Sequence, residues 1–158
     1  MLVESDVVDA VCVHLVALGY TIQQRLPPTK QGVDIIALRP DSPRELWVEA
    51  KGETSERKTS ARYGVPFDSA QVNIHVAEAV YTAIKHLASI PSGTDRAISI
   101  ALPSNELHRK YADAVSPVLA RLGVPIFWVQ PDNSVKLSPE GFLHRPSSGS
   151  SGAAQQLD

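Results

Sequence analysis

Three charged residues, Asp34, Glu49 and Lys51, lie within or next to apolar stretches of the sequence. Residues 45–51 alternate with a period of two, which predicts a strand with Glu49 and Lys51 on one face and apolar side chains on the other. Residues 32–38 form a second apolar run, and as a neighbouring strand this run can bring Asp34 alongside. Charges on apolar strands cost free energy unless something pairs with them. We therefore expect this trio to do chemistry.

Two carboxylates and one amine on a shared face suit the hydrolysis of a phosphodiester bond. A divalent cation assists that reaction because it neutralises the phosphate and lowers the pKa of the attacking water. Mg²⁺ prefers oxygen ligands and keeps several waters, so the carboxylates of Asp34 and Glu49 are enough to bind it. Lys51 stays protonated beside them and can orient the water and stabilise the transition state. The simpler alternative is an ion pair of Glu49 and Lys51 at a strand end.

The elements that position the trio follow from hydrophobic periodicity and turn residues. Residues 1–144 are expected to form one domain, and residues 145–158, rich in serine and glycine, a disordered tail. The predicted order α, β, β, β, α, β, α, β indicates an α/β fold with a mixed sheet between helices, in three layers. The predicted helices are 4–18, 68–89 and 103–123, and the predicted strands are 20–25, 32–38, 45–51, 96–102 and 124–129, with a hairpin turn at 131–134.

In this order of elements the sequence resembles the PD-(D/E)xK nuclease superfamily, which includes many restriction endonucleases and archaeal Holliday-junction resolvases. The resemblance rests on an acid early in the first helix, on the segments ending in Asp34 and Lys51, and on a helix that opens with Gln71. Val33 stands where the name of the motif has proline, a position at which the family often departs from it. The resemblance covers about residues 4–102 and implies a restriction endonuclease-like fold.

The resemblance also implies roles for individual residues. It assigns the metal to the carboxylates of Asp34 and Glu49 and to the carbonyl of Ala50. Glu4 corresponds to the family's acid on the first helix, which touches the metal through water. Asp9 is the rival for that position, and either acid can instead simply favour a helix amino terminus.

Gln71 has two readings that the sequence leaves open. Asp68 and Gln71 fit a capping box at the start of the second helix, which would give the glutamine a purely structural role. Alternatively, Gln71 contributes to catalysis, as the resemblance implies. His75 follows one turn later and could face the site, but a solvated side chain is expected. The five histidines show no metal-ligand spacing, so zinc is not expected.

Charge gives little support to a dedicated nucleic-acid binder, because the formal net charge is −2. Contacts with a polyanion must then come from a local patch. The stretch 52–66 is expected to be a mobile surface loop, and it carries Arg57, Lys58 and Arg62 directly after the trio. These three residues can contact phosphates, although a solvated loop explains them equally well.

The sequence as a whole therefore predicts a Mg²⁺- or Mn²⁺-dependent endonuclease that acts on nucleic acid, with DNA as the expected substrate. An RNA-directed nuclease and a non-catalytic nucleic-acid-binding module on the same fold are the alternatives, and a homodimer stays open. Cys12 is the only cysteine, no apolar run is long enough to span a membrane, and no secretory leader opens the chain. These features favour a cytoplasmic protein without membrane contacts.

Overall fold

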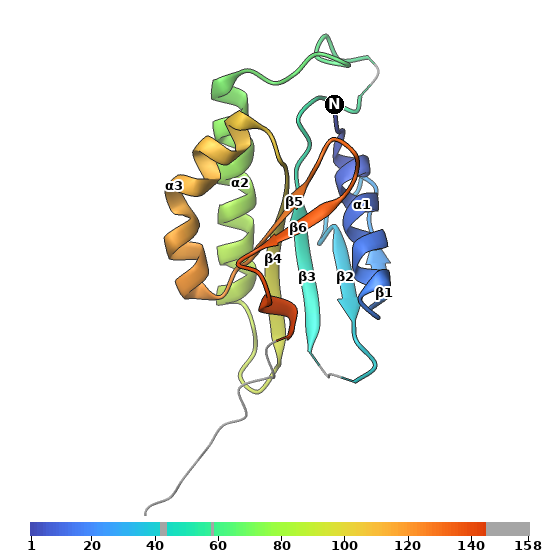
Figure 1. Cartoon of the computed structure of the whole chain (residues 1–158), viewed down its shortest axis with the longest axis vertical. Helices are drawn as coiled ribbons and strands as arrows, with labels where there is room; N and C mark the ends of the chain where they lie inside the picture. Colours follow the sequence, from blue (N-terminus) through green and yellow to red (C-terminus); the bar gives the residue numbers. More distant parts are fainter. Residues whose placement is uncertain (42–43, 58, 145–158) are drawn as a thin grey trace, which may run out of the picture.

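The computed structural model describes residues 1–41, 44–57 and 59–144 (Figure 1). The predicted tail at 145–158 lies outside these residues. The order of the elements matches the prediction and adds one strand and a short 3-10 helix at the end. The helices are α1 Glu4–Ala17, α2 Ser69–Ala88, α3 Glu106–Leu122 and η1 Phe142–His144; the strands are β1 Thr21–Arg25, β2 Ile35–Leu38, β3 Glu45–Ala50, β4 Arg96–Pro103, β5 Ile126–Val129 and β6 Val135–Ser138.

The named strands form one six-stranded sheet in the order β1-β2-β3-β4-β5-β6. The neighbouring pairs β1/β2, β2/β3 and β5/β6 are antiparallel, whereas β3/β4 and β4/β5 are parallel. Parallel neighbours need a crossover connection, and α2 and α3 provide the two crossovers. The predictions of a mixed sheet and of a hairpin after the fifth strand are confirmed.

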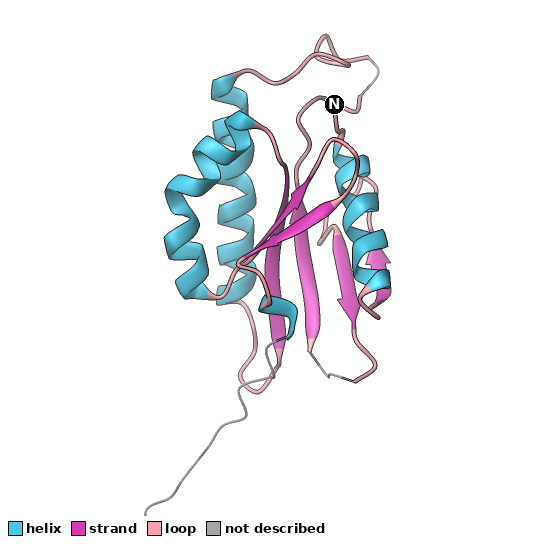
Figure 2. Cartoon of the chain, viewed as in Figure 1, coloured by secondary structure: helices cyan, strands magenta, loops and turns pink. Residues whose placement is uncertain are grey.

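Helices cover both faces of the sheet, as the predicted three-layer α/β/α fold requires (Figure 2). Helix α1 packs on one face, and α2 and α3 pack together on the other. The core on the α1 side includes Val7, Val11, Leu15, Ile35, Val48 and Phe127. The core on the α2 and α3 side includes Val72, Val76, Ala83, Ile100, Leu119 and Trp128. Among the residues that the structure describes, no helix has the length and apolar character needed to cross a bilayer.

The second strand is shorter than predicted. Residues 32–38 were expected to be continuous, but β2 begins only at Ile35. The reason lies at Gly32, whose φ of 145° is in a region that favours glycine and bends the chain before the strand. Asp34 consequently stands at the entrance of β2, where its carbonyl accepts a hydrogen bond from Leu26 N at 2.8 Å.

One end of the sheet gathers the amino ends of all three helices, at the top of Figure 1. β3 and β4 run toward this end, and α2 and α3 start from it and run back. Helix α1 starts there as well, on the opposite face of the sheet. Each helix amino end carries a partial positive charge, which favours an anion bound directly at it.

Gly52 permits the close approach of α1 to this end of β3. A Cβ atom built on Gly52 would lie 2.6 Å from Glu4 N and 2.8 Å from the carbonyl carbon of Val3. Both contacts are with backbone, which cannot swing aside as a flexible side chain can. The missing side chain therefore lets the first turn of α1 lie against the chain directly after Lys51.

We predict that Gly52→Ala destabilises the protein by about 1–3 kcal/mol, because the added methyl group forces the start of α1 away from the sheet. The melting temperature measured by circular dichroism or calorimetry checks this. An unchanged melting temperature would contradict the close approach.

Candidate active site

The pairing of β2 with β3 brings Asp34 and Glu49 together. Ile35 pairs with Val48 and Ile36 with Trp47 in this antiparallel ladder. Continuing the register by one residue places Asp34 directly opposite Glu49, on the same face of the sheet. Directly opposite residues have Cβ atoms about 4.5–5.5 Å apart. Both side chains are buried, each with 9% of its surface exposed.

Two short hydrogen bonds tie the trio to the end of β3. The N–H group of Ala50 donates to Asp34 Oδ2 at 2.7 Å, and the Lys51 ammonium donates to Glu49 Oε1 at 2.7 Å. These bonds use Asp34 Oδ2 and Glu49 Oε1, and the other oxygen of each carboxylate is not part of these two bonds. Lys51 is held in turn by its own N–H group, which donates to Ala101 O of β4 at 3.1 Å.

Glu4 adds a third acid to this group, whereas Asp9 does not. Glu4 is half-buried in the first turn of α1, close enough to Asp34, Glu49 and Lys51 for their charges to act on it. Asp9 lies farther along the helix, half-exposed, in an ion pair with Arg25. Of the two candidates on the first helix, the structure thus brings Glu4 to the trio.

Burial sets the protonation of these acids. It raises the pKa of Glu4 to about 7, an effect that Lys51 opposes and that the neighbouring carboxylates reinforce. Burial likewise raises the pKa of Asp34 to about 6, opposed by the hydrogen bond from Ala50. Burial alone would lower the pKa of Lys51, but the charges of Glu49, Glu4 and Asp34 outweigh it and raise that pKa. Three acids therefore share one ammonium group, and negative charge is in excess.

The donor set of this group fits a hard divalent cation. It offers carboxylate oxygens from neighbouring strands, with excess negative charge that such an ion would neutralise. Within the described ranges, no three His, Cys, Asp or Glu side chains converge as a ready-made metal cluster. A cation bound here would consequently rely on Asp34 and Glu49, on backbone oxygen and on water, as Mg²⁺ commonly does.

A cavity of about 480 Å³ opens beside the trio. Glu4 and Gly52 form the part of its wall that adjoins the trio, and Phe67 and His75 line it as well. His75 was expected to be solvated, and this prediction is wrong. Its ring is half-buried and stands edge-on to Phe67 with ring centroids 4.4 Å apart, because the turn before α2 folds over it.

The loop after the trio has internal contacts that the sequence did not predict. Thr54 is 5% exposed, and its hydroxyl lies 2.8 Å from Val65 O and 3.0 Å from Arg62 O. Isolated bridges join Thr54 to Pro66 and Ser55 to Tyr63. The buried threonine closes the base of this surface loop, and the mobility expected of residues 52–66 stays a prediction.

The three basic residues of this loop have different positions. Arg57 is exposed and lines the cavity beside the trio. Arg62 lies 3.4 Å from Asp68 in an exposed ion pair at the start of α2. Lys58 lies outside the described residues. Only Arg57 is thus placed at the cavity by the described structure.

Gln71 forms the capping box that its sequence context predicted. Its N–H group donates to Asp68 Oδ1 at 3.0 Å, and its side-chain oxygen accepts from Asp68 N at 3.1 Å. The structural alternative for Gln71 is therefore confirmed. A catalytic part for the same side chain stays a prediction, because its oxygen is already engaged at the cap.

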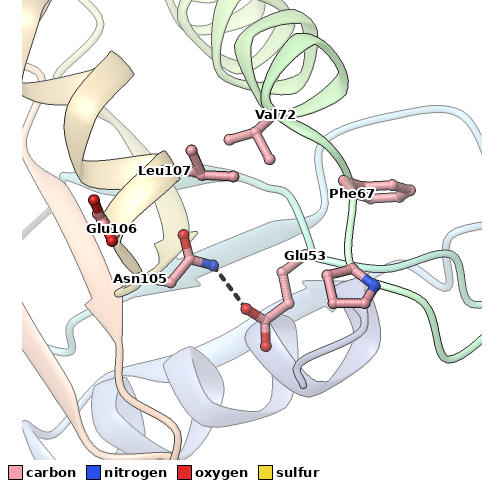
Figure 3. A pocket seen from close by; sticks show the side chains of 7 residues that line it. Glu53, Phe67, Val72, Asn105, Glu106 and Leu107 are labelled. Carbon is pink, nitrogen blue, oxygen red and sulfur yellow. Dashed lines mark hydrogen bonds between the residues drawn. The ribbon is translucent and has the colours of Figure 1, made fainter.

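Sequence reasoning missed Glu53 and Glu56, two acids that shape the site. Glu53 accepts hydrogen bonds from Leu2 N at 2.6 Å and from Asn105 Nδ2 at 2.7 Å, the latter drawn in Figure 3 beside a cavity of about 230 Å³. It thereby joins the start of α1, the chain after Lys51 and the start of α3. Glu56 accepts from Ser5 Oγ at 2.6 Å. The partners of both acids are about 50 residues away, a separation at which sequence periodicity carries no signal.

Comparison with known proteins places this chain in no family. No family model matches it, and no curated protein does. The solved structure of Pyrococcus furiosus SfsA in complex with Ca²⁺ shows a weak likeness, with 14% sequence identity, 82% of this chain and 58% of that chain covered, and a TM-score of 0.33. The chain thus spans little more than half the length of that protein.

The raised pKa of Glu4 leads to a prediction about pH. Between about pH 4.5 and 7 the folded protein holds a proton on Glu4 that the unfolded chain releases, so the contribution of this residue to stability falls as the pH rises. Without divalent metal, the melting temperature of Glu4→Gln relative to that of the wild type should therefore rise as the pH increases through this range. At higher pH the difference between the two melting temperatures should stay constant. Parallel thermal scans in chelator measure the difference.

Asp9→Asn, on the same helix but far from the trio, is the control and should show no such gain with rising pH. A difference between Glu4→Gln and wild type that is independent of pH would contradict the burial of Glu4 beside the other acids.

Proposed function

We propose that this protein is a divalent-cation-dependent nuclease of the PD-(D/E)xK type, which hydrolyses phosphodiester bonds in DNA. The observation that carries the proposal is the position of Asp34 opposite Glu49, with Lys51 bonded to Glu49, at the end of the sheet where three helices begin. Asp34, at the start of β2, meets Glu49 and Lys51, at the end of β3. Apolar residues of similar size at these buried positions would stabilise the fold at least as well as these charged residues do.

Asp34, Glu49 and the carbonyl of Ala50 would hold one Mg²⁺ or Mn²⁺ ion, which when bound neutralises the scissile phosphate and lowers the pKa of bound water. The hydrogen bond from Ala50 N orients Asp34, and Lys51 orients Glu49. Glu4 lies near these residues, and by the resemblance it would contact the metal through water. Because its pKa is about 7, Glu4 can hold or release a proton at neutral pH.

In this proposal Lys51 contacts the substrate and the attacking water and is not a ligand of the cation. Its pKa is raised by the surrounding acids, so the ammonium keeps its charge at neutral pH. One of its three protons is donated to Glu49, which leaves two donors for the attacking water and for a phosphate oxygen. A fixed charge of this kind stabilises the negative charge that develops on the phosphate in the transition state.

The end of the sheet at which the trio lies also suits a polyanion, despite the net charge of −2. The amino ends of α1, α2 and α3 add partial positive charges there (Figure 1). Arg57 adds a full charge at the wall of the cavity. DNA is the substrate class that the resemblance to restriction and repair nucleases implies, and RNA is the alternative that an assay must separate from it.

Cleavage assays with purified protein test the proposal. Supercoiled, linear, branched and single-stranded DNA and RNA are incubated with Mg²⁺, Mn²⁺ or chelator. We expect metal-dependent cleavage of DNA, and a loss of about 100-fold or more in each of Asp34→Asn, Glu49→Gln and Lys51→Ala. The losses should be non-additive, because these residues act as a unit.

Glu45→Gln is the matched control, since Glu45 lies on the same face of β3 at the opposite end of the strand. It should cleave like the wild type. Full activity in Asp34→Asn would exclude the proposed site. Tight binding of nucleic acid without cleavage in any metal would instead favour the non-catalytic module.

The placement of Arg57 and Arg62 gives a second prediction. Each phosphate contact contributes about 0.9 to the slope of log K against log salt for duplex DNA and about 0.7 for a single strand. Arg57→Ala should flatten this slope by about one contact, since Arg57 stands at the cavity. Arg62→Ala should change it less, because Arg62 is paired with Asp68. Fluorescence anisotropy at several salt concentrations measures both, and equal slopes for Arg57→Ala and wild type would remove Arg57 from the interface.

A further inference from the structure

Helix α2 carries an apolar stripe on the side that faces away from the sheet. The residues of this outer stripe are all exposed, and they follow one another at intervals of four and three residues. They are Ala70, Ile74, Ala77, Tyr81, Ile84 and Ala88. The large members are exposed to 55% at Ile74, 68% at Tyr81 and 40% at Ile84. Alternating intervals of four and three are typical of a helix that packs along its length against another helix.

The outer stripe is distinct from the face that α2 already uses. The helix packs on the sheet and on α3 through Val72, Val76, Ala79 and Ala83, which lie on the opposite side of the helical wheel. A surface helix normally shows charged residues on its outer side. Apart from the two histidines His75 and His86, the acidic and basic side chains of α2 are Glu78 and Lys85, and both lie along the same edge of the outer stripe.

These two charges indicate what packs on the stripe. In an antiparallel pair of α2 helices related by a two-fold axis, Glu78 of one copy can lie beside the partner's Lys85, and the reverse pair forms by symmetry. In a parallel pair the two-fold axis would place these same-edge positions on opposite sides of the interface, so Glu78 and Lys85 would not pair. The charge pattern is therefore self-complementary only in the antiparallel arrangement.

We propose that two copies of this chain form an antiparallel dimer through the outer stripes of their α2 helices. Pairing Glu78 with the partner's Lys85 places the two-fold axis midway between these positions, next to Tyr81. In this register Ile84 lies near the partner's Ala77, and Ile74 near the partner's Ala88. Large side chains of one helix thus meet small ones of the other, which permits close packing.

The proposed dimer fixes how far apart the two candidate sites lie. The dimer itself does not depend on the proposed function of those sites. Gln71, at the site end of α2, lies about ten residues from the axis. With a rise of 1.5 Å per residue, the two copies of Gln71 are about 30 Å apart along the helix axes. The two sites lie at opposite ends of the helix pair. Each copy contains a complete trio of its own, because Asp34, Glu49 and Lys51 all belong to one chain.

Measurement of mass in solution tests the proposal without any assay of activity. Sedimentation equilibrium over a range of protein concentrations should show a monomer–dimer equilibrium for the full chain. Tyr81→Glu should weaken the dimer by about tenfold or more, because it places two like charges next to the axis. Val13→Glu is the matched control: Val13 is 72% exposed on α1, and its replacement should leave the equilibrium unchanged.

Two further sets of variants test the direction of the helices. Glu78→Lys and Lys85→Glu should each weaken the dimer, and the double variant should restore it. In a Cys12→Ser background, Tyr81→Cys should form a disulfide-linked dimer on mild oxidation, whereas Ile74→Cys should not, because its two copies lie far from the axis.

A wild type that stays monomeric at all concentrations would overturn the proposal. A dimer that Tyr81→Glu leaves intact would overturn it too, since another surface would then be responsible. Efficient cross-linking of Ile74→Cys would show that the helices are parallel and would overturn the antiparallel arrangement.

Discussion

The burial of three acids beside one lysine is the constraint on which the rest of this structure depends. Glu4 comes from a helix, Asp34 from the entrance of β2 and Glu49 from β3, and Lys51 lies beside them and offsets part of their charge. Such an arrangement is unfavourable in a protein that lacks a use for it, because buried carboxylates lose hydration. Gly52, the bend before β2 and the register of β2 with β3 all serve to hold this group together.

Much of this could be predicted from the sequence because it depends on local pattern. The alternation in residues 45–51 assigns Glu49 and Lys51 to one face, and a one-residue slip would expose the whole apolar face of the strand, so the register is strongly specified. The same reasoning gives the α/β order, the three layers and the cap at Asp68 and Gln71. Where the predicted and observed starts of β2 differ by three residues, the cause is backbone geometry at Gly32.

The remaining features depend on contacts that join distant segments, and no local pattern reports them. Glu53 reaches Leu2 and Asn105, and Thr54 closes its loop by binding carbonyls eight and eleven residues away. The outer stripe of α2 was hidden for a different reason. A helix with apolar residues on two sides reads from sequence as a well-buried helix, and only the fold separates the side that packs on the sheet from the side that stays exposed.

The central claim is that the buried acids hold a divalent cation, and calorimetric titration of the metal-free protein with Mn²⁺ tests it most directly. Measured near pH 6.5 in buffers of different ionisation enthalpy, the account predicts one binding event that releases protons, because Glu4 and Asp34 have raised pKa values. Asp34→Asn should lose this binding, whereas Glu45→Gln should retain it. Absence of binding in the wild type, or equal affinity in Asp34→Asn, would contradict the account.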